Sequence, residues 1–214
     1  MKGVIVFTKV PERGYVKRKL QAKLPAYLVE ELYVAFLEDT LGKLRDYFPF
    51  VAYYPPEKLH VLWNILGERK YIVQRGKDLG ERICNMSSDF YRMGIRDMVI
   101  VGCDVPTLGK EHVDEAFKLM ASHDLVLGPS HDGGFYLIGG GGVRRELFDG
   151  VVWKTPGVLD VVVGNAGKLG LSVARIQPLR DVDNPEDLEA VWKSGELDRG
   201  GRTYGVMKRL RQRV

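Results

Sequence analysis

The chain has 214 residues, of which 45% are hydrophobic and 28% charged, with a formal net charge of +4. No apolar run approaches the roughly 20 residues of a membrane-spanning helix, and the N-terminus leads into a strand pattern rather than a signal peptide, so we expect a cytoplasmic protein. Cys84 and Cys103 are the only cysteines, and without a close pair or nearby histidines they predict neither a disulfide framework nor a zinc site.

Aliphatic runs alternate with helical patterns along the chain, which is typical of α/β proteins. Helical patterns are expected from near residue 25 to before 49, over 79–93 and over 110–121. No linker or internal repeat divides the sequence, so residues 1–214 are predicted to form a single domain. The predicted strands are residues 3–8, 50–54, 71–74, 97–102, 124–128, 135–139 and 171–176.

The connection before the strand at 135–139 is unusually short. Only a few residues separate it from the preceding strand, whereas a parallel crossover needs a dozen or more. This strand is therefore predicted to be antiparallel to its predecessor. The expected fold is a three-layer α/β/α domain whose mostly parallel, mixed sheet contains one reversed strand. The glycine run at 139–142 is expected to be a flexible loop, because it opens no phosphate-binding helix.

Asp104 closely follows an aliphatic strand and stands before Val105 and Pro106. Open α/β sheets bind ligands beyond the carboxyl ends of their strands. A buried bare carboxylate would be costly, so we expect Asp104 to be solvated, hydrogen-bonded or facing a cation. Capping of the following turn is the alternative interpretation.

A basic loop follows the first predicted strand. Residues 8–20 carry five basic side chains, and backbone N–H groups together with Lys or Arg suit a polyphosphate. The loop matches neither the P-loop nor the dinucleotide-binding fingerprint. A solvated basic loop is the alternative. The five side chains are Lys9, Arg13, Lys17, Arg18 and Lys19.

The segment 180–188 begins a predicted helix, with Asp183 or Asn184 as its N-cap. Asp181 and Asp183 alternate on an extended segment and so point to the same side. Magnesium typically uses one or two carboxylates together with waters and substrate phosphates. We therefore predict Asp104 and Asp183 as a pair that binds Mg²⁺ or Mn²⁺, with Asp181 and Asp132 as reserves.

Three other segments allow two interpretations each. Asp132 and Gly133 are either site residues near a ligand or a hairpin turn. Residues 74–83 either line a nucleotide pocket or form a capped amphipathic helix. The basic tail at 199–213 either favours an anionic ligand or is a solvated helix face. Binding of nucleic acid is not expected, because Tyr204 is the tail's only aromatic platform.

Segments in order along nearly the whole chain resemble the signature blocks of the radical-SAM/selenodomain-associated transferases, a glycosyltransferase-A-like family. The resemblance implies the nucleotide-diphospho-sugar transferase fold, shared with molybdopterin and 2-phospholactate guanylyltransferases and with sugar nucleotidyltransferases. The segments are residues 7–17, 76–82, 102–108, 128–139, 147–155 and 181–188.

The resemblance also implies roles for individual residues. Asp104 and the segment 181–183 would bind the metal, while Arg13 and Lys17 would meet the nucleotide phosphates. The implied nucleotide and phosphate site comprises Lys9, Arg13, Gly14, Lys17, Asp78, Gly80 and Arg82. The implied acceptor side comprises Asp132, Gly133, Trp153 and Thr155.

The chain departs from the family pattern in two places. The usual Val-Lys-Thr-Arg-Leu is replaced by residues 16–20, Val-Lys-Arg-Lys-Leu, which loses a hydroxyl and the bidentate geometry of one arginine. The usual Trp-Ser-Thr becomes Trp153-Lys154-Thr155, on the acceptor side.

Our first functional hypothesis is metal-dependent nucleotidyl transfer from a nucleoside triphosphate to a small-molecule acceptor, with Asp104 and Lys17 as catalytic residues and release of pyrophosphate. The alternative is glycosyl transfer from a nucleotide sugar, in which the same metal would stabilise a departing diphosphate. A third hypothesis is a non-catalytic nucleotide-binding protein. Each predicts a nucleotide partner, and a homo-oligomer is left open.

Overall fold

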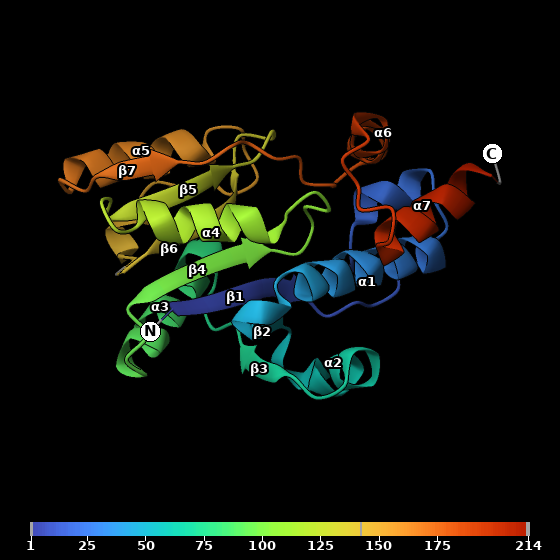
Figure 1. Cartoon of the computed structure of the whole chain (residues 1–214), viewed down its shortest axis with the longest axis horizontal. Coiled ribbons are helices and arrows are strands. Elements are labelled where there is room, and N and C mark those ends of the chain that lie inside the picture. The colour runs from blue at the N-terminus through green and yellow to red at the C-terminus, as the bar shows by residue number, and fades with distance from the viewer. Residues whose placement is uncertain (1, 142, 213–214) are drawn as a thin grey trace.

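The computed structural model describes residues 2–141 and 143–212, which contain a seven-stranded sheet with helices on both faces (Figure 1). The strands are β1 (Lys2–Lys9), β2 (Phe50–Tyr54), β3 (Lys70–Val73), β4 (Asp97–Gly102), β5 (Leu125–Pro129), β6 (Phe135–Gly140) and β7 (Val173–Arg175). The α-helices are α1 (Ala26–Lys43), α2 (Leu59–Leu66), α3 (Leu79–Arg92), α4 (Lys110–Leu119), α5 (Val158–Lys168), α6 (Pro185–Ser194) and α7 (Arg202–Arg211). Short 3-10 helices are η1 (Arg18–Ala22), η2 (Arg45–Tyr47), η3 (Pro56–Lys58) and η4 (Arg145–Phe148).

The strand order is β3-β2-β1-β4-β6-β5-β7. The strand β6 is antiparallel to both β4 and β5, and the other neighbours are parallel. The predicted reversed strand is thus confirmed. After β1 the chain adds β2 and β3 on one side, and then β4 on the other. The switch point of this open sheet therefore lies between β1 and β4, where such folds bind ligands.

The core occupies both faces of the sheet, because alternate residues of a strand point to opposite sides. Val4 and Val6 of β1 belong to one buried cluster, which also contains residues of α1, α4 and α7. Ile5 and Phe7 belong to a second cluster, which contains residues of α3 and α5. Six successive residues of β1 are buried. This burial on both faces explains the near-continuous apolar strands and confirms the three-layer α/β/α fold.

Several element boundaries differ from those expected. The pattern over 25–49 divides into α1 and η2, while α2 and α5 were not predicted. Each of these two helices is rich in apolar residues, and a short apolar run does not distinguish a helix from a strand. Part of the glycine run expected to be a loop belongs to β6, which extends through Gly140. Gly142 lies outside the described residues.

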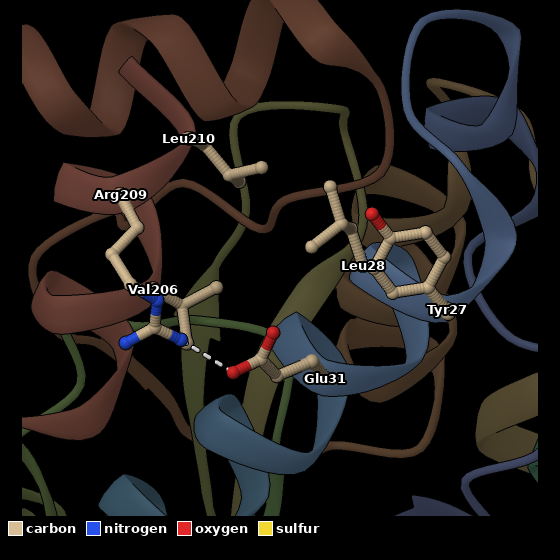
Figure 2. A pocket seen from close by; sticks show the side chains of 6 residues that line it. All are labelled: Tyr27, Leu28, Glu31, Val206, Arg209 and Leu210. Carbon is tan, nitrogen blue, oxygen red and sulfur yellow. Dashed lines mark hydrogen bonds and ion pairs between the residues drawn. The ribbon is translucent and has the colours of Figure 1, made fainter. Parts of the chain in front are cut away.

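The C-terminal helix α7 packs beside α1 (Figure 1). A cavity of about 140 Å³ lies between the two helices, lined by Tyr27, Leu28, Glu31, Val206, Arg209 and Leu210 (Figure 2). The arginines of the tail that the structure describes are exposed, as a solvated helix face predicts, and three of them form the ion pairs Arg202–Glu38, Arg209–Glu31 and Arg211–Glu189. Among the described residues, no helix is long and apolar enough to cross a membrane.

Candidate active site

Lys17 joins the two aspartates that the sequence singled out as metal ligands. Its Nζ donates hydrogen bonds to Asp104 Oδ2 at 2.7 Å and to Asp183 Oδ1 at 2.5 Å. The Lys17 side chain is only 7% exposed, whereas those of Asp104 and Asp183 are 36% and 43% exposed. Three residues from distant segments therefore meet around one ammonium group, with both carboxylates still accessible to solvent.

Sheet topology and one backbone hydrogen bond explain this meeting. Lys9 ends β1, and Asp104 follows the last residue of the parallel strand β4 by two positions. Both therefore lie at the carboxyl edge of the switch point. Val182 N donates to Asp104 O at 2.9 Å, which fixes the segment carrying Asp181 and Asp183 beside the end of β4.

The start of α6 leaves the Asp183 carboxylate available. Asn184 is the N-cap, with its side chain accepting from Asp187 N at 2.9 Å. The Asp187 carboxylate accepts in return from Asp183 N at 3.1 Å and Asn184 N at 3.2 Å, and it also accepts from Arg180 at 3.1 Å. Of the two N-caps considered, the structure therefore selects Asn184, and the side chain of Asp183 points to Lys17 instead.

Four carboxylate groups lie close to one another at the site. Burial, followed by the negative charges of Asp132, Asp104 and Asp183, raises the pKa of Asp181 to about 7. Burial would raise the pKa of Asp104 too, but the charge and hydrogen bond of Lys17 outweigh it and lower that pKa. Repulsion among four neighbouring carboxylates favours the arrival of further positive charge.

This donor set fits a divalent cation such as Mg²⁺. The available ligands are carboxylate oxygens, and Mg²⁺ typically takes only one or two of these and completes its shell with water and phosphate oxygens. Within residues 2–141 and 143–212, no group of three or more His, Cys, Asp or Glu side chains is arranged to hold a metal ion. Asp104 and Asp183 would by themselves supply the one or two carboxylate oxygens of such a shell.

A buried polar cluster supports the ends of β1 and β4, and sequence reasoning missed it. The Tyr33 hydroxyl accepts from Lys9 N at 3.0 Å and lies 3.2 Å from Thr8 Oγ1 and 3.4 Å from Cys103 Sγ. Burial raises the pKa of Tyr33 and raises that of Cys103 to about 11, so both groups stay neutral near pH 7. Tyr33 falls within a long apolar helical pattern, and nothing in the sequence indicates that its hydroxyl reaches the next layer.

Of the basic-loop residues expected to meet the phosphates, only some lie near Asp104 and Asp183. Arg13 is 67% exposed and pairs with Glu30 at 3.1 Å, so its guanidinium is held at α1 rather than at the carboxylates. Gly14 occupies the basic loop with a φ of +84°. In the basic loop, Lys17 thus contacts the carboxylates, and Lys19 approaches Asp183 at 3.9 Å.

The segment expected to line the nucleotide pocket forms the start of α3. Asp78 caps this helix, accepting from Glu81 N at 2.9 Å. Arg82 Nε donates to Gly76 O at 3.1 Å, and its guanidinium lies 3.9 Å from the centre of the Tyr54 ring. The capped helix is confirmed, and the nucleotide pocket stays a prediction. The Arg82 guanidinium is a cationic group stacked on an aromatic ring at the end of β2.

Close backbone contacts surround Gly80 and Gly133, and local hydrogen bonds hold Asp132 and Thr155 on the expected acceptor side. A Cβ on Gly80 would approach Trp153 to 3.0 Å, so only glycine lets α3 come this close to that indole. Gly133, with a φ of +87°, lies against Pro156, where an added Cβ would be 2.0 Å from the carbonyl oxygen. Asp132 accepts from Gly134 N at 2.9 Å and so stabilises its own turn. Thr155 Oγ1 donates to Val152 O at 2.7 Å.

Residues 39–155 match a protein family described as "Uncharacterized protein conserved in bacteria (DUF2064)". The chain belongs to this family. The match includes Asp104 and the residues expected on the acceptor side, and it excludes Lys17 and Asp183. No curated protein matches this DUF2064 protein. The narrower radical-SAM association stays a prediction.

Solved structures share the fold of this DUF2064 protein. A candidate nucleotide-diphospho-sugar transferase from Desulfovibrio desulfuricans G20 is 27% identical, with a TM-score of 0.91 over 97% of this chain and 94% of its own. A CMP:2-keto-3-deoxy-manno-octonic acid synthetase complexed with CTP is 12% identical, with a TM-score of 0.52 over 92% and 99%. The inositol-1-phosphate CTP transferase from T. maritima is 15% identical, with a TM-score of 0.52 over 97% and 95%. These similarities establish the nucleotide-diphospho-sugar transferase fold.

Proposed function

We propose that this protein transfers a nucleoside monophosphate from a nucleoside triphosphate to a small acceptor, with release of pyrophosphate and dependence on a divalent cation. The observation that carries the proposal is the meeting of Lys17, Asp104 and Asp183 at the switch point of the sheet. Fold alone does not determine chemistry. The combination of paired carboxylates with a basic loop, however, provides both charges that a metal-bound polyphosphate needs.

Each residue has a defined task in this reaction. Asp104 and Asp183 would hold Mg²⁺ or Mn²⁺, which when bound would neutralise negative charge on the phosphates. Lys17 and Lys9 would bind phosphate oxygens as positive point charges. An acceptor oxygen would then form a bond to the α-phosphorus while the bond to the departing pyrophosphate breaks. The protein's contribution is mainly to orient the reactants and to stabilise charge.

Glycosyl transfer is the second candidate, and one observation favours it. The structure with a TM-score of 0.91 is described as a candidate nucleotide-diphospho-sugar transferase. The same carboxylates and lysines would then stabilise a nucleoside diphosphate as the leaving group. A nucleotide-binding protein without catalysis is the third candidate.

One product analysis distinguishes these functions. The protein is incubated with Mg²⁺ and panels of nucleoside triphosphates or nucleotide sugars, each with candidate acceptors, and the released product is identified. Pyrophosphate and a nucleotidyl acceptor support the proposed reaction, whereas a nucleoside diphosphate and a glycosylated acceptor support glycosyl transfer. Nucleotide binding without any product supports the third candidate.

The Asp104→Ala substitution tests the assignment of the carboxylate pair. We expect turnover to fall by roughly two or more orders of magnitude, the scale seen when one preorganised electrostatic group is removed. The matched control is Asp114→Ala, which removes a carboxylate that is 48% exposed and pairs with Lys110 on α4. Folding is checked by circular dichroism. Unchanged turnover in folded Asp104→Ala protein would contradict the role of Asp104.

A further inference from the structure

Among residues 2–141 and 143–212, the ammonium groups of Lys9 and Lys154 form no ion pair with a carboxylate. Lys9 ends β1, and Lys154 lies in the loop between η4 and α5. Burial and then the positive charge of Lys154 lower the pKa of Lys9, while Asp104 and Asp183 act in the opposite direction. The two ammonium groups therefore repel each other next to the site, a cost that a bound anion would relieve.

The backbone at Lys154 is held in an unusual conformation. Lys154 has a φ of +68°, and among the described residues only Lys17 and Phe48 are other non-glycine residues with positive φ. The left-handed region is energetically unfavourable for an L-residue, because Cβ comes close to the following carbonyl oxygen. Such a conformation persists where surrounding contacts impose it, and it is found preferentially at functional sites.

Neighbouring contacts fix this loop on both sides of Lys154. The Trp153 ring lies 5.8 Å from that of Phe148 and 6.5 Å from that of Phe135, centre to centre. Beyond Lys154, the turn at Gly133 packs against Pro156. Lys154 itself is exposed. A rigid backbone thus presents a free cationic side chain next to the aromatic unit and the Asp132 turn.

The electrostatics of the site explain why a cation is useful at this position. An anionic acceptor approaching Asp104 and Asp183 is repelled by the carboxylate cluster. Lys17 does little to offset this repulsion of the acceptor, because its ammonium is already paired with both aspartates. Lys154 belongs to a different segment from the basic loop and adds positive charge between Trp153 and Thr155, the residues that the family resemblance assigns to the acceptor side.

We propose that Lys154 binds an anionic group of the acceptor, either a phosphate monoester or a carboxylate. This inference rests on the proposed function, since it concerns the second substrate of the same site. The family that this chain resembles usually has serine at this position, so the preference for an anion belongs to this chain's own Trp153-Lys154-Thr155 sequence. Lys154 acts by binding and takes no part in bond breaking.

The first test measures binding without turnover. Inorganic phosphate and, separately, acetate are titrated by calorimetry into wild-type protein, Lys154→Ser and the control Lys118→Ser, in buffer with a chelator. Lys118 is an exposed lysine of α4, toward the helix end away from Asp104. Loss of one charge-assisted hydrogen bond is expected to weaken the anion's affinity about tenfold in Lys154→Ser, with the control unchanged. Equal affinity in all three proteins, or no anion binding by the wild type, would overturn the inference.

The second test measures acceptor preference. Acceptors with one carbon skeleton are compared with and without a phosphate or carboxylate, which also identifies the anion recognised. We expect Lys154→Ser to lower kcat/KM for the anionic acceptor about tenfold with the nucleotide's KM unchanged, and Lys154→Arg to retain activity. A wild type that prefers the neutral acceptor refutes the role of Lys154 while the proposed function stands. If no nucleotide donor is consumed, the proposed function fails, and calorimetry alone decides whether Lys154 binds anions.

Discussion

Replacing Lys17 with methionine tests whether one ammonium group holds the acidic site together. Methionine keeps an unbranched stem of similar length but removes the charge. The backbone φ of +43° at this position disfavours both residues alike, so the comparison reports the lost charge and hydrogen bonds. The substitution leaves Asp104 and Asp183 without their shared partner and next to Asp181.

The exposure of the three side chains sets the size of the effect. Removing one partner of a fully buried ion pair costs about 3–5 kcal/mol, and an exposed pair contributes about 0–1 kcal/mol. Lys17 is 7% exposed but its partners are 36% and 43% exposed, so water solvates the remaining carboxylates in part. We expect Lys17→Met to lower the free energy of unfolding by about 2 kcal/mol, which for a chain of this size lowers Tm by roughly 4–8 °C.

Thermal unfolding in a chelator, followed by circular dichroism, measures this loss. Lys19→Met is the matched control, because Lys19 is 73% exposed and 3.9 Å from Asp183; its loss is expected to cost less than about 0.5 kcal/mol. Added Mg²⁺ is expected to raise the Tm of Lys17→Met more than that of the wild type, since the variant's carboxylates lack a counter-ion. Equal Tm values for Lys17→Met and the wild type would refute the reasoning.

Three further predictions follow from the same contacts. Because the pKa of Asp181 is raised to about 7, the folded chain binds a proton that the unfolded chain releases, and stability is lost as pH rises from about 4 through 7. Asp181→Asn should therefore be about 1–2 kcal/mol more stable than the wild type at pH 8, as measured by urea unfolding in a chelator. Gly133→Ala should lower the free energy of unfolding by more than about 2 kcal/mol, because the strain of a positive φ adds to the clash with Pro156. Gly150→Ala is the control: its Cβ meets no atom within 4 Å, so only the strain remains, about 1–2 kcal/mol. Similar losses of stability in the two variants would contradict the contact with Pro156. Burial raises the pKa of the Cys84 thiol to about 11, so its labelling by a disulfide reagent should be slow at pH 8 and accelerate toward pH 11 in folded protein.

The fold was predictable from sequence because its signals are local. The aliphatic runs identify all seven strands to within a few residues, and the short segment between β5 and β6 identifies the reversed strand. The helix α5 was missed because three successive valines and two glycines obscure the helical pattern. Its helical state depends on packing beneath the sheet, where Val162 and Ala166 are fully buried.

The site was predictable only in part, because some of its hydrogen bonds and pKa shifts depend on contacts between residues that are far apart in the sequence. Asp104 and Asp183 are marked by their places at a strand end and before a helix. The hydrogen bonds of Tyr33 cross from α1 to β1 and to Cys103, which follows β4, and no local sequence pattern indicates such a contact. The raised pKa of Asp181 likewise depends on carboxylates from three separate positions.

The position of Lys17 links cation binding to phosphate binding under the proposed function. The carboxylate oxygens that accept hydrogen bonds from Lys17 are the same groups that would hold a divalent cation. A cation at these oxygens would weaken their attraction for the ammonium, which would then gain more from phosphate oxygens than from the aspartates. Each of the two ligands would therefore lower the cost of binding the other, and by thermodynamic linkage the effect would be reciprocal. Under the proposed function, the lysine that neutralises the two aspartates in the free protein would thus hold the substrate's phosphates once the cation is bound.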